Sequence, residues 1–350
     1  MTGVRKIALV GAGVIGTHHG KIISQLGDRL ELAAVADIQL DKAQKLAAER
    51  GGTPYASLAE ALAAHSDIDI VTVCTPTGRH GVVAIEALAA GKHVIVEKPA
   101  EITVDRTDEI IAARDKAGTQ VTVISQHRFD PSTETTLAAI ERGELGRLTS
   151  GIASIDWWRG QSYYDSGDWR GTWDLDGGGA LMNQGVHTVD LLVAAMGRPV
   201  EVFAYTGTLA HQRIEVEDVA VGVVRFESGA LGVLHATTAA YPGLSARLQV
   251  HGDRGSAVID NDQLVFLRTT APGGEAEEQA YGSTSAREVP TAGSDPSQLS
   301  DAHQSQYLNF LGALDGTERL RVDLETNRQS IAVITGVYES ARTGRPVVLR

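Results

Sequence analysis

The sequence predicts two domains, an α/β domain with a parallel sheet over residues 1–126 and an α+β domain with a largely antiparallel sheet over residues 127–350. Short apolar runs alternate with helical stretches in the first part, which is typical of a parallel sheet. Phe129-Asp130-Pro131 interrupts this alternation. After about residue 200, strand-like runs follow one another across short turns, as in an antiparallel sheet.

The first strand leads into a phosphate-binding pattern. Arg5 to Val10 forms a short apolar run, and GAGVIG follows it before a helical stretch that continues to about Leu26. In a GxGxxG loop at this position, Gly11 permits a tight turn, Gly13 lets a pyrophosphate approach the backbone, and Gly16 lets the helix pack closely on the strand. The N-terminus of the helix supplies N–H groups to the phosphates.

The second strand ends at an acidic residue. Leu30 to Ala36 is apolar, and Asp37 follows it about 20 residues after the glycines. A carboxylate at this point accepts hydrogen bonds from the adenosine ribose and repels a 2′-phosphate, which favours NAD over NADP. The alternative is that Asp37 caps the helix that begins near Asp41. Strand, loop, helix and acid together predict dinucleotide binding.

Three further strands complete the predicted parallel sheet, over Ile68 to Cys74, His93 to Val96 and Gln120 to Ser125. Ligands of such sheets bind beyond the carboxyl ends of the strands. The residues at these ends are Gly11, Asp37, Thr75, Lys98 and Gln126. A single crevice is therefore expected to collect them. His80 could line this crevice or simply begin a helix, while His18 and His19 are expected to be surface or packing residues.

Composition limits the class of partner. The chain has a net charge of −13, which disfavours nucleic acid or an anionic membrane as its main partner. The single cysteine, Cys74, excludes an intramolecular disulfide and fits a reducing compartment. It ends an apolar strand, so a buried structural thiol is expected rather than a nucleophile. No apolar run is long enough to span a bilayer, and a cytoplasmic location is expected.

The stretch from Asp174 to Asp190, DLDGGGALMNQGVHTVD, predicts one wall of a site. Three glycines lead into a predicted helix over Ala180 to Met196. Asn183 and His187 stand four residues apart in this helix, so they share one face. Because the segment is otherwise apolar, a polar pair on one face indicates a binding surface, and the glycines are expected to leave room for substrate or cofactor.

The loop before this stretch concentrates aromatic residues. Gln161 to Trp173 contains two of the 8 tyrosines and two of the 4 tryptophans of the chain, together with Arg170. Aromatic faces stack on the C–H faces of sugars, and arginine donates to hydroxyls or phosphates. A substrate-binding loop is the prediction, and a packed loop anchored by tryptophan is the alternative.

The rest of the second part predicts helix, sheet and helix. A helix is expected over Ser132 to Glu141 and a strand over Leu148 to Trp158. Further strands are expected over Val200 to Thr208, Asp218 to Phe226, Ala230 to Thr238, Ala246 to His251, Gly255 to Asp260 and Gln263 to Arg268. Two helices, Asp301 to Leu314 and Leu324 to Arg342, follow a long polar loop over Thr270 to Ser300, which could cover the site or contact another subunit.

Several motifs together resemble the glucose–fructose oxidoreductase/inositol dehydrogenase (Gfo/Idh/MocA) family. They are GAGVIG, Asp37, CTPTGRH, the Glu97-Lys98-Pro99 tripeptide and the ending YESARTGRPVVL. The family pattern GGGxLxDxGxHxxD matches Gly177, Gly178, Gly179, Leu181, Gly185, His187 and Asp190. Asn183 departs from this pattern, because many polyol dehydrogenases of the family have Asp there.

The resemblance implies a Rossmann domain followed by an α+β domain with a large open, mostly antiparallel sheet, whose exposed face contacts other subunits in a dimer or tetramer. It also implies that His187 is the acid/base and that Lys98 lies near the nicotinamide and the substrate. The reaction it implies is hydride transfer between NAD and a hydroxyl-bearing carbon of a sugar or polyol. Asn183 can still hydrogen-bond a substrate hydroxyl.

The expected site residues combine the residue patterns with this resemblance. Lys98 and His187 are the expected catalytic residues. The expected cofactor-binding residues are Gly11, Gly13, Val14, Ile15, Gly16, Asp37, Thr75, Pro76, His80, Glu97, Lys98 and Gln126. The expected substrate-binding residues are Asn183, Arg170, Trp169, Tyr163 and His127. His127 could equally be structural at the domain joint. No metal is expected, since His187 and Asp190 lack further ligands nearby.

Two other functions stay open at this point. One is redox-neutral chemistry on the same fold, glycoside cleavage or epimerisation with bound NAD. The other is a sensor that binds NAD without catalysis. A sensor is expected to have lost the lysine and the histidine, and both Lys98 and His187 are present.

Overall fold

The computed structural model describes residues 3–269 and 302–350, which form two compact units. Among the described residues, the first unit consists of 3–126, 174–177 and 302–328, and the second of 127–173, 178–269 and 329–350. The units therefore do not follow a single division of the chain near residue 127, because a late segment returns to the first unit. The loop predicted over residues 270–300 lies outside the described residues.

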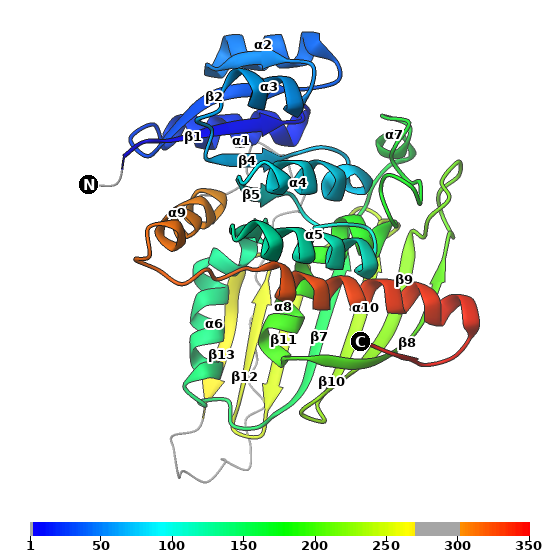
Figure 1. Cartoon of the computed structure of the whole chain (residues 1–350). Coiled ribbons are helices and arrows are strands. Elements are labelled where there is room, and N and C mark those ends of the chain that lie inside the picture. Colours follow the sequence, from blue (N-terminus) through cyan, green and yellow to red (C-terminus); the bar gives the residue numbers. More distant parts are fainter. Residues whose placement is uncertain (1–2, 270–301) are drawn as a thin grey trace. The chain divides into compact units, whose positions relative to one another are not determined.

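The first unit contains a six-stranded parallel sheet in the order β3-β2-β1-β4-β5-β6 (Figure 1). Its strands are β1 (Arg5–Val10), β2 (Leu30–Ala36), β3 (Thr53–Tyr55), β4 (Ile70–Val73), β5 (His93–Val96) and β6 (Val121–Val123). Its helices are α1 (Val14–Gln25), α2 (Leu40–Arg50), α3 (Leu58–Ala64), η1 (Thr77–Arg79), α4 (His80–Ala89), α5 (Val104–Ala117) and α9 (Ala302–Leu314). The strand order reverses between β1 and β4, which is where such sheets bind ligands. The predicted parallel sheet is confirmed.

Both faces of this sheet are buried, as the uninterrupted apolar strands predict. Ile7 and Leu9 of β1 join one apolar cluster with α1, α2 and α9, while Ala8 and Val10 join another with α3, α4 and α5. Alternate residues of one strand therefore serve opposite layers. Helix α9 belongs to the first unit because its apolar side chains complete one of these two layers.

The second unit contains an eight-stranded sheet in the order β13-β12-β11-β7-β10-β9-β8-β14. Its strands are β7 (Leu148–Asp156), β8 (Pro199–Gly207), β9 (Val219–Phe226), β10 (Leu231–Thr237), β11 (Ala246–Gly252), β12 (Gly255–Asp260), β13 (Gln263–Thr269) and β14 (Val347–Val348). The neighbouring strands pair antiparallel except β7 and β10, which are parallel. This confirms the predicted, mostly antiparallel sheet.

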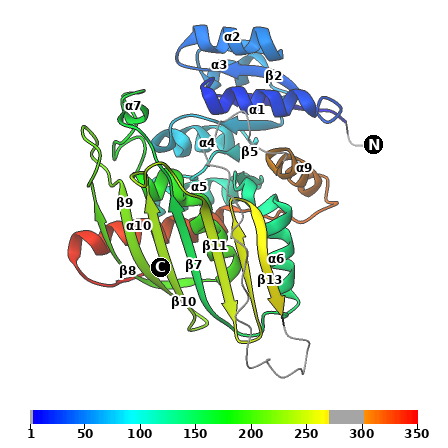
Figure 2. The same ribbon diagram turned by 180° about the vertical axis from the view of Figure 1, so that it is seen from behind.

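Helices cover one face of this sheet (Figure 1), and the opposite face is turned toward the viewer in Figure 2. The helical segments are η2 (Gln126–Phe129), α6 (Pro131–Glu141), α7 (Gln161–Tyr164), η3 (Ala180–Gly185), α8 (Val186–Met196) and α10 (Leu324–Thr343). Apolar residues of η3, α8 and α10 pack on the sheet in one core. On the opposite face, Val221, Val223 and Leu231 are 47%, 52% and 58% exposed. The sheet is thus buried on one side only.

Candidate active site

The glycine loop after β1 has the geometry of a phosphate cradle. An added Cβ at Gly11 would lie 2.5 Å from the Cys74 carbonyl oxygen, and one at Gly16 would lie 1.9 Å from the Gly11 carbonyl oxygen. Both glycines are therefore required by the packing of the chain itself. Gly13 differs, because an added Cβ there would meet nothing within 4 Å. Open space over Gly13, directly before α1, is what a bound pyrophosphate needs, so these residues fit a dinucleotide.

Asp37 ties the glycine loop to the end of β2. One carboxylate oxygen accepts a hydrogen bond from the Ala12 N–H at 2.7 Å, and the other accepts one from the Gln39 N–H at 2.8 Å. Helix α2 begins after Gln39, so Asp37 is not its N-cap residue, contrary to the alternative drawn from sequence. Asp37 is half-buried at the carboxyl end of β2, where the ribose of a dinucleotide would lie.

Two polar atoms near the ends of β4 and β6 lack a protein partner. Thr75 Oγ1 and Gln126 Oε1 are buried without a hydrogen bond to any described residue. Buried polar atoms are normally paired, and unpaired ones point to a water or a ligand. These two atoms therefore support the assignment of Thr75 and Gln126 to a ligand site. Pro76, next to Thr75, begins the turn into η1.

His80 links two loops of the first unit through its ring. Its ring is buried, with Nδ1 2.7 Å from the Pro99 carbonyl oxygen and Nε2 2.8 Å from the Thr75 carbonyl oxygen. Burial lowers its pKa, and the two carbonyls oppose that shift. Both ring nitrogens contact the protein, so the ring joins the loops that follow β4 and β5. His80 is also the first residue of α4, one of the two positions that the sequence allowed. Its place among the cofactor-binding residues stays a prediction.

Glu97 holds the backbone of Lys98. It accepts a hydrogen bond from the Lys98 N–H at 3.0 Å, and its other oxygen lies 2.8 Å from His19 Nε2. Although burial raises the pKa of Glu97, its hydrogen bond with His19 lowers that pKa to about 2. The Tyr307 hydroxyl lies 2.7 Å from His19 Nδ1. Both Glu97 oxygens thus contact the protein, one of them holds the Lys98 backbone, and His19 is a core residue. The assignment of Glu97 to the cofactor-binding residues stays a prediction.

Cys74 is a free, buried thiol, as the sequence predicted. Burial raises its pKa well above the ordinary value, which keeps it protonated and unreactive.

The helix of the second unit that carries Asn183 and His187 presents them as a pair. Between residues 176 and 193, all other side chains are buried, and these two alone are partly exposed. The helix begins as the π-helical turn η3, which contains Asn183, and continues as α8, which contains His187. The predicted shared face is therefore present. The π-helical turn was not predicted, although such turns are frequent at functional sites.

The sequence predicted that the three glycines before η3 leave room for a ligand. In the structure, atoms of the protein itself occupy the space beside each of them. An added Cβ at Gly178 would lie 2.2 Å from the Tyr338 hydroxyl, and one at Gly179 would lie 1.7 Å from the Glu217 carbonyl oxygen. At Gly177, the added Cβ would lie 2.4 Å from Ile102. These glycines are required because the protein's own atoms fill the space beside them.

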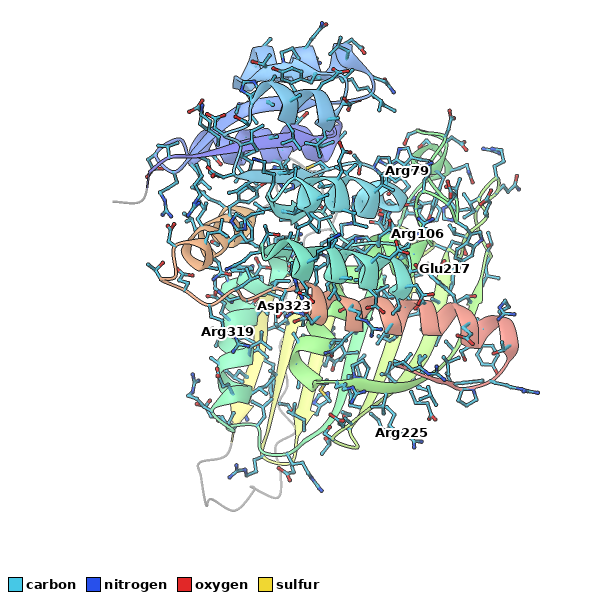
Figure 3. All side chains as sticks on the ribbon, in the orientation of Figure 1. Arg79, Arg106, Glu217, Arg225, Arg319 and Asp323 are labelled. Atoms are coloured by element: carbon cyan, nitrogen blue, oxygen red, sulfur yellow. The ribbon has the colours of Figure 1, made fainter. Side chains whose placement is uncertain are left out.

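Glu217, which is labelled in Figure 3, holds the start of η3, and no sequence motif pointed to this residue. Its carboxylate accepts hydrogen bonds from the Gly179 and Leu181 N–H groups, both at 2.8 Å, and from the Tyr338 hydroxyl at 3.1 Å. Burial raises its pKa to about 7, and the backbone donors limit that rise. The only signal in the sequence is an acidic pair, Glu217-Asp218, directly before an apolar strand.

Asp218 fixes a second loop of the same unit. It accepts hydrogen bonds from the Leu209, Ala210 and His211 N–H groups. His211 in turn lies 2.7 Å from the Arg159 carbonyl oxygen through Nε2. The acidic pair thus holds both the segment that carries Asn183 and the aromatic loop region next to it.

The predicted substrate residues of the aromatic loop form one polar network with Asn183. Arg170 donates to the Tyr163 hydroxyl at 2.7 Å and stacks on the Tyr163 and Trp169 rings. Gln184 donates to the same hydroxyl and to Asn183 Oδ1, both at 2.9 Å. The structure therefore brings together residues that the sequence could only assign separately.

His127 lies beside His187, with their ring centroids 5.0 Å apart in an edge-to-face arrangement. Its Nδ1 is 2.7 Å from Asp130 and 3.1 Å from Asp262. Burial opposes protonation, but the hydrogen bonds with the two carboxylates raise the pKa of His127 to about 10. A cationic ring is thus held next to His187 by two acidic residues.

Asp190 anchors α8. It forms a bidentate pair with Arg128 at 2.6 and 2.7 Å and accepts a hydrogen bond from the Ser330 hydroxyl at 3.3 Å.

Two groups of histidine and carboxylate ligands are close enough to hold a metal within the described ranges, His19 with Glu97 and His303, and His127 with Asp130 and Asp262. Neither group includes His187 or Asp190.

Across the described helices, none combines the length and the apolar character that crossing a membrane requires.

Known families match both parts of the chain. Residues 5–125 match the oxidoreductase family with an NAD-binding Rossmann fold, and residues 133–258 match the GFO/IDH/MocA C-terminal domain. The oxidoreductase YrbE of Bacillus subtilis is 30% identical over 73% of this chain and 73% of its own length. Myo-inositol 2-dehydrogenase of Thermotoga maritima is 29% identical over 73% and 75%, respectively.

A solved structure is similar over the whole chain. The WlbA dehydrogenase from Bordetella pertussis, in complex with NADH and UDP-GlcNAcA, has a TM-score of 0.87 and 32% sequence identity, and the match covers 99% of both chains. Its NADH agrees with the NAD-binding family that the first 125 residues match. The chain therefore belongs to the GFO/IDH/MocA family of oxidoreductases, with an NAD-binding Rossmann domain at its N-terminal end.

Proposed function

We propose that the protein oxidises or reduces a hydroxyl-bearing carbon of a sugar, inositol or sugar derivative. The observation that carries this proposal is the pairing of Asn183 and His187, the only partly exposed side chains between residues 176 and 193, in an oxidoreductase with an NAD-binding domain. When bound, NAD supplies the acceptor or donor of the hydride. The residues of the protein supply position, charge and proton exchange.

His187 is the proposed acid/base. An imidazole can accept a proton from a substrate hydroxyl and release it again near neutral pH. Lys98 is proposed to donate a hydrogen bond to the same oxygen and to stabilise the negative charge that develops on it. Asn183 orients the sugar through its amide, which can donate and accept. Glu97 supports this role of Lys98, because it holds the Lys98 backbone.

The first unit is proposed to bind the cofactor. Gly13 leaves open space for the pyrophosphate, and the N–H groups of Val14 and Ile15 at the start of α1 are available to it. Asp37 is proposed to accept hydrogen bonds from the ribose, which favours NAD over NADP. The second unit is proposed to bind the substrate, through Asn183 and the aromatic loop.

The relatives agree with a sugar or polyol as substrate. One is named a myo-inositol 2-dehydrogenase, and WlbA was crystallised with UDP-GlcNAcA. We propose further that the protein assembles with copies of itself through the exposed face of its eight-stranded sheet, where valine and leucine side chains of β9 and β10 are half exposed.

A substrate panel tests the function. Inositols, aldoses, uronates and nucleotide sugars are each supplied with NAD, and the absorbance of the reduced nicotinamide is followed. At least one sugar or polyol is expected to reduce NAD, and Lys98→Ala is expected to lower the rate by about 100-fold or more. Lys42→Ala, at an exposed position of α2, is the matched control and should leave the rate unchanged.

Two results would contradict the proposal. No reduction of NAD by any member of the panel would exclude the dehydrogenase activity. Substrate turnover by purified protein without added NAD and without net formation of NADH would instead indicate a redox-neutral reaction with retained cofactor.

A further inference from the structure

A chain of buried polar side chains in the first unit leads to Lys98. The Thr72 hydroxyl lies 3.1 Å from the Tyr307 hydroxyl, which lies 2.7 Å from His19 Nδ1. His19 Nε2 lies 2.8 Å from one oxygen of Glu97, and the other oxygen accepts the Lys98 N–H at 3.0 Å. The four residues before Lys98 are each at most 5% exposed. We call these four residues the polar chain.

The polar chain connects four separate elements. Thr72 belongs to β4, Glu97 directly follows β5, His19 lies in the second turn of α1, and Tyr307 lies in α9. The N-terminus of α1 is proposed to bind the pyrophosphate, and Glu97 begins the segment that carries Lys98. His19 therefore joins the proposed cofactor helix to the segment of the proposed catalytic lysine.

Glu97 depends on His19 for its charge. Burial raises the pKa of Glu97, and the hydrogen bond with His19 opposes this effect, so that the pKa is lowered to about 2. A buried charge that loses its partner is strongly unfavourable. Without His19, Glu97 would therefore take up a proton or turn toward another donor. Either change alters the group that accepts the Lys98 N–H.

The contacts also fix the orientation of the His19 ring. An ionised carboxylate can only accept, so Nε2 donates to Glu97. The Tyr307 hydroxyl can donate to Nδ1 of a neutral ring or accept from a charged one. In both states the ring keeps two partners, and it cannot turn without losing both. A buried network of this kind holds its members rigidly.

We infer that His19 is a positioning residue for Lys98, because through Glu97 it fixes the backbone from which the lysine side chain extends. Tyr307 holds the His19 ring and adds to the same effect. This inference rests on the proposed dehydrogenase function, in which Lys98 donates to the substrate oxygen. A misplacement of about 1 Å can cost about 100-fold in rate. The loss of His19 therefore affects kcat rather than the binding of NAD.

The test removes the contacts of the polar chain one at a time. His19→Leu removes both ring contacts, His19→Gln keeps an N–H donor for Glu97, and Tyr307→Phe removes one hydroxyl. Each change is made in the wild type and in Lys98→Ala, and kcat for NAD reduction is measured with a substrate from the panel. Ile22→Val is the matched control, since Ile22 is a buried apolar residue of the same helix.

The expected result is a loss of kcat that requires Lys98. In the wild type, His19→Leu should lower kcat by about 10- to 100-fold, while the dissociation constant of NAD stays within about twofold. His19→Gln should recover most of this loss, and Tyr307→Phe should lower kcat by about threefold. In Lys98→Ala, none of these changes should lower kcat further by more than about twofold, because the group that they position is absent. Ile22→Val should leave kcat unchanged in both.

Hydrogen exchange gives a second readout, which needs neither substrate nor cofactor. The peptide that contains Lys98 should exchange faster in His19→Leu than in the wild type, because its N–H loses a charged acceptor. Ile22→Val should leave the exchange of this peptide unchanged. Mass spectrometry measures the exchange.

A kcat of His19→Leu within about twofold of the wild-type value would overturn the inference. An equal loss of kcat in the wild type and in Lys98→Ala would overturn it too, since His19 would then act on the fold as a whole. Should His19→Leu not fold, Tyr307→Phe decides, and a wild-type kcat for that variant contradicts the inference.

Failure of the proposed function is a distinguishable result. If no sugar of the panel reduces NAD, the dehydrogenase function is wrong. The exchange of the Lys98 peptide then still decides whether His19 holds this segment, and unchanged exchange in His19→Leu would show that it does not.

Discussion

At the scale of single residues, Glu217 is the side chain on which the geometry of the candidate site depends most. Its carboxylate holds the first N–H groups of the segment that carries Asn183, while burial raises its pKa to about 7. A buried acid with a raised pKa binds its proton more tightly in the folded protein than in the unfolded one. Its contribution to stability is therefore greatest at low pH and falls as the pH rises from about 4.5 to about 7.

Glu217→Gln tests this titration. The free energy of unfolding of the wild type should fall relative to that of the variant between pH 5 and pH 8 (roughly the interval in which Glu217 ionises), by up to about 3 kcal/mol, because the variant cannot ionise. Urea denaturation at a series of pH values measures the difference. Glu215→Gln, two residues away and exposed, is the control. Parallel pH profiles for the wild type and Glu217→Gln would show that Glu217 does not titrate in this range.

His127 provides a second test of a raised pKa, in this case that of a base, which is charged when it is protonated. Its pKa is raised to about 10, through its hydrogen bonds with Asp130 and Asp262 and against its burial. A histidine with a raised pKa stabilises the folded state fully below about pH 6.5, and this contribution is lost as the pH rises toward 10. NMR titration of the histidine ring protons should show one imidazole that stays charged through pH 8. If His127→Gln leaves every histidine titration curve in place, the raised pKa is not that of His127.

At the scale of elements, the glycine loop before α1 contains one glycine that the packing requires, Gly16, and one that is proposed to face the cofactor, Gly13. Gly16 abuts the Gly11 carbonyl oxygen, whereas Gly13 faces open space. Gly16→Ala should therefore destabilise the fold by about 1–3 kcal/mol or more, as other overpacking changes do. Gly13→Ala should leave the melting temperature unchanged and weaken NAD binding by about 10-fold or more, because the methyl group fills the space for the pyrophosphate.

Calorimetric titration with NAD and thermal unfolding measure the two effects on the same pair of variants. Equal NAD affinity of Gly13→Ala and the wild type would place the pyrophosphate elsewhere. A Gly16→Ala protein as stable as the wild type would show that the loop can rearrange.

The order of helices and strands along the chain was predictable from the sequence, because apolar periodicity and turn residues are local signals. The strands β1, β2 and β5 carry the bounds that their apolar runs predicted. The role of the glycines before η3 was not predictable. Their neighbours, Glu217 and Tyr338, come from distant parts of the chain, so only the folded structure shows that these side chains fill the space.

The same reason explains the other differences at the site. The two ring nitrogens of His80 meet carbonyl oxygens of Thr75 and Pro99, and the latter lies on a separate loop. His19 meets Glu97 and Tyr307, which belong to different elements. Such partners depend on tertiary packing. Asn183 and His187 were predictable as a pair, because their spacing along one helix decides that they share a face.

At the scale of the whole molecule, we propose that the protein self-associates through the exposed face of the eight-stranded sheet, where Val221, Val223 and Leu231 are about half exposed. Val223→Glu, in the middle of β9, should shift the protein toward smaller assemblies, because a charge would have to be buried at the contact. Size-exclusion chromatography with light scattering measures this shift. Val82→Glu, at an exposed position of α4, is the control. A wild-type protein that is monomeric at all concentrations would contradict the proposed assembly.

The most direct test of the central claim is the rate of NAD reduction by His187→Ala with a substrate identified from the panel. If His187 exchanges the substrate proton, the rate of the first turnover should fall by about 100-fold or more, while the dissociation constant of NAD stays within about twofold of the wild-type value. The reduced nicotinamide is followed by absorbance in a single turnover. A His187→Ala protein that reduces NAD near the wild-type rate would show that another group is the acid/base.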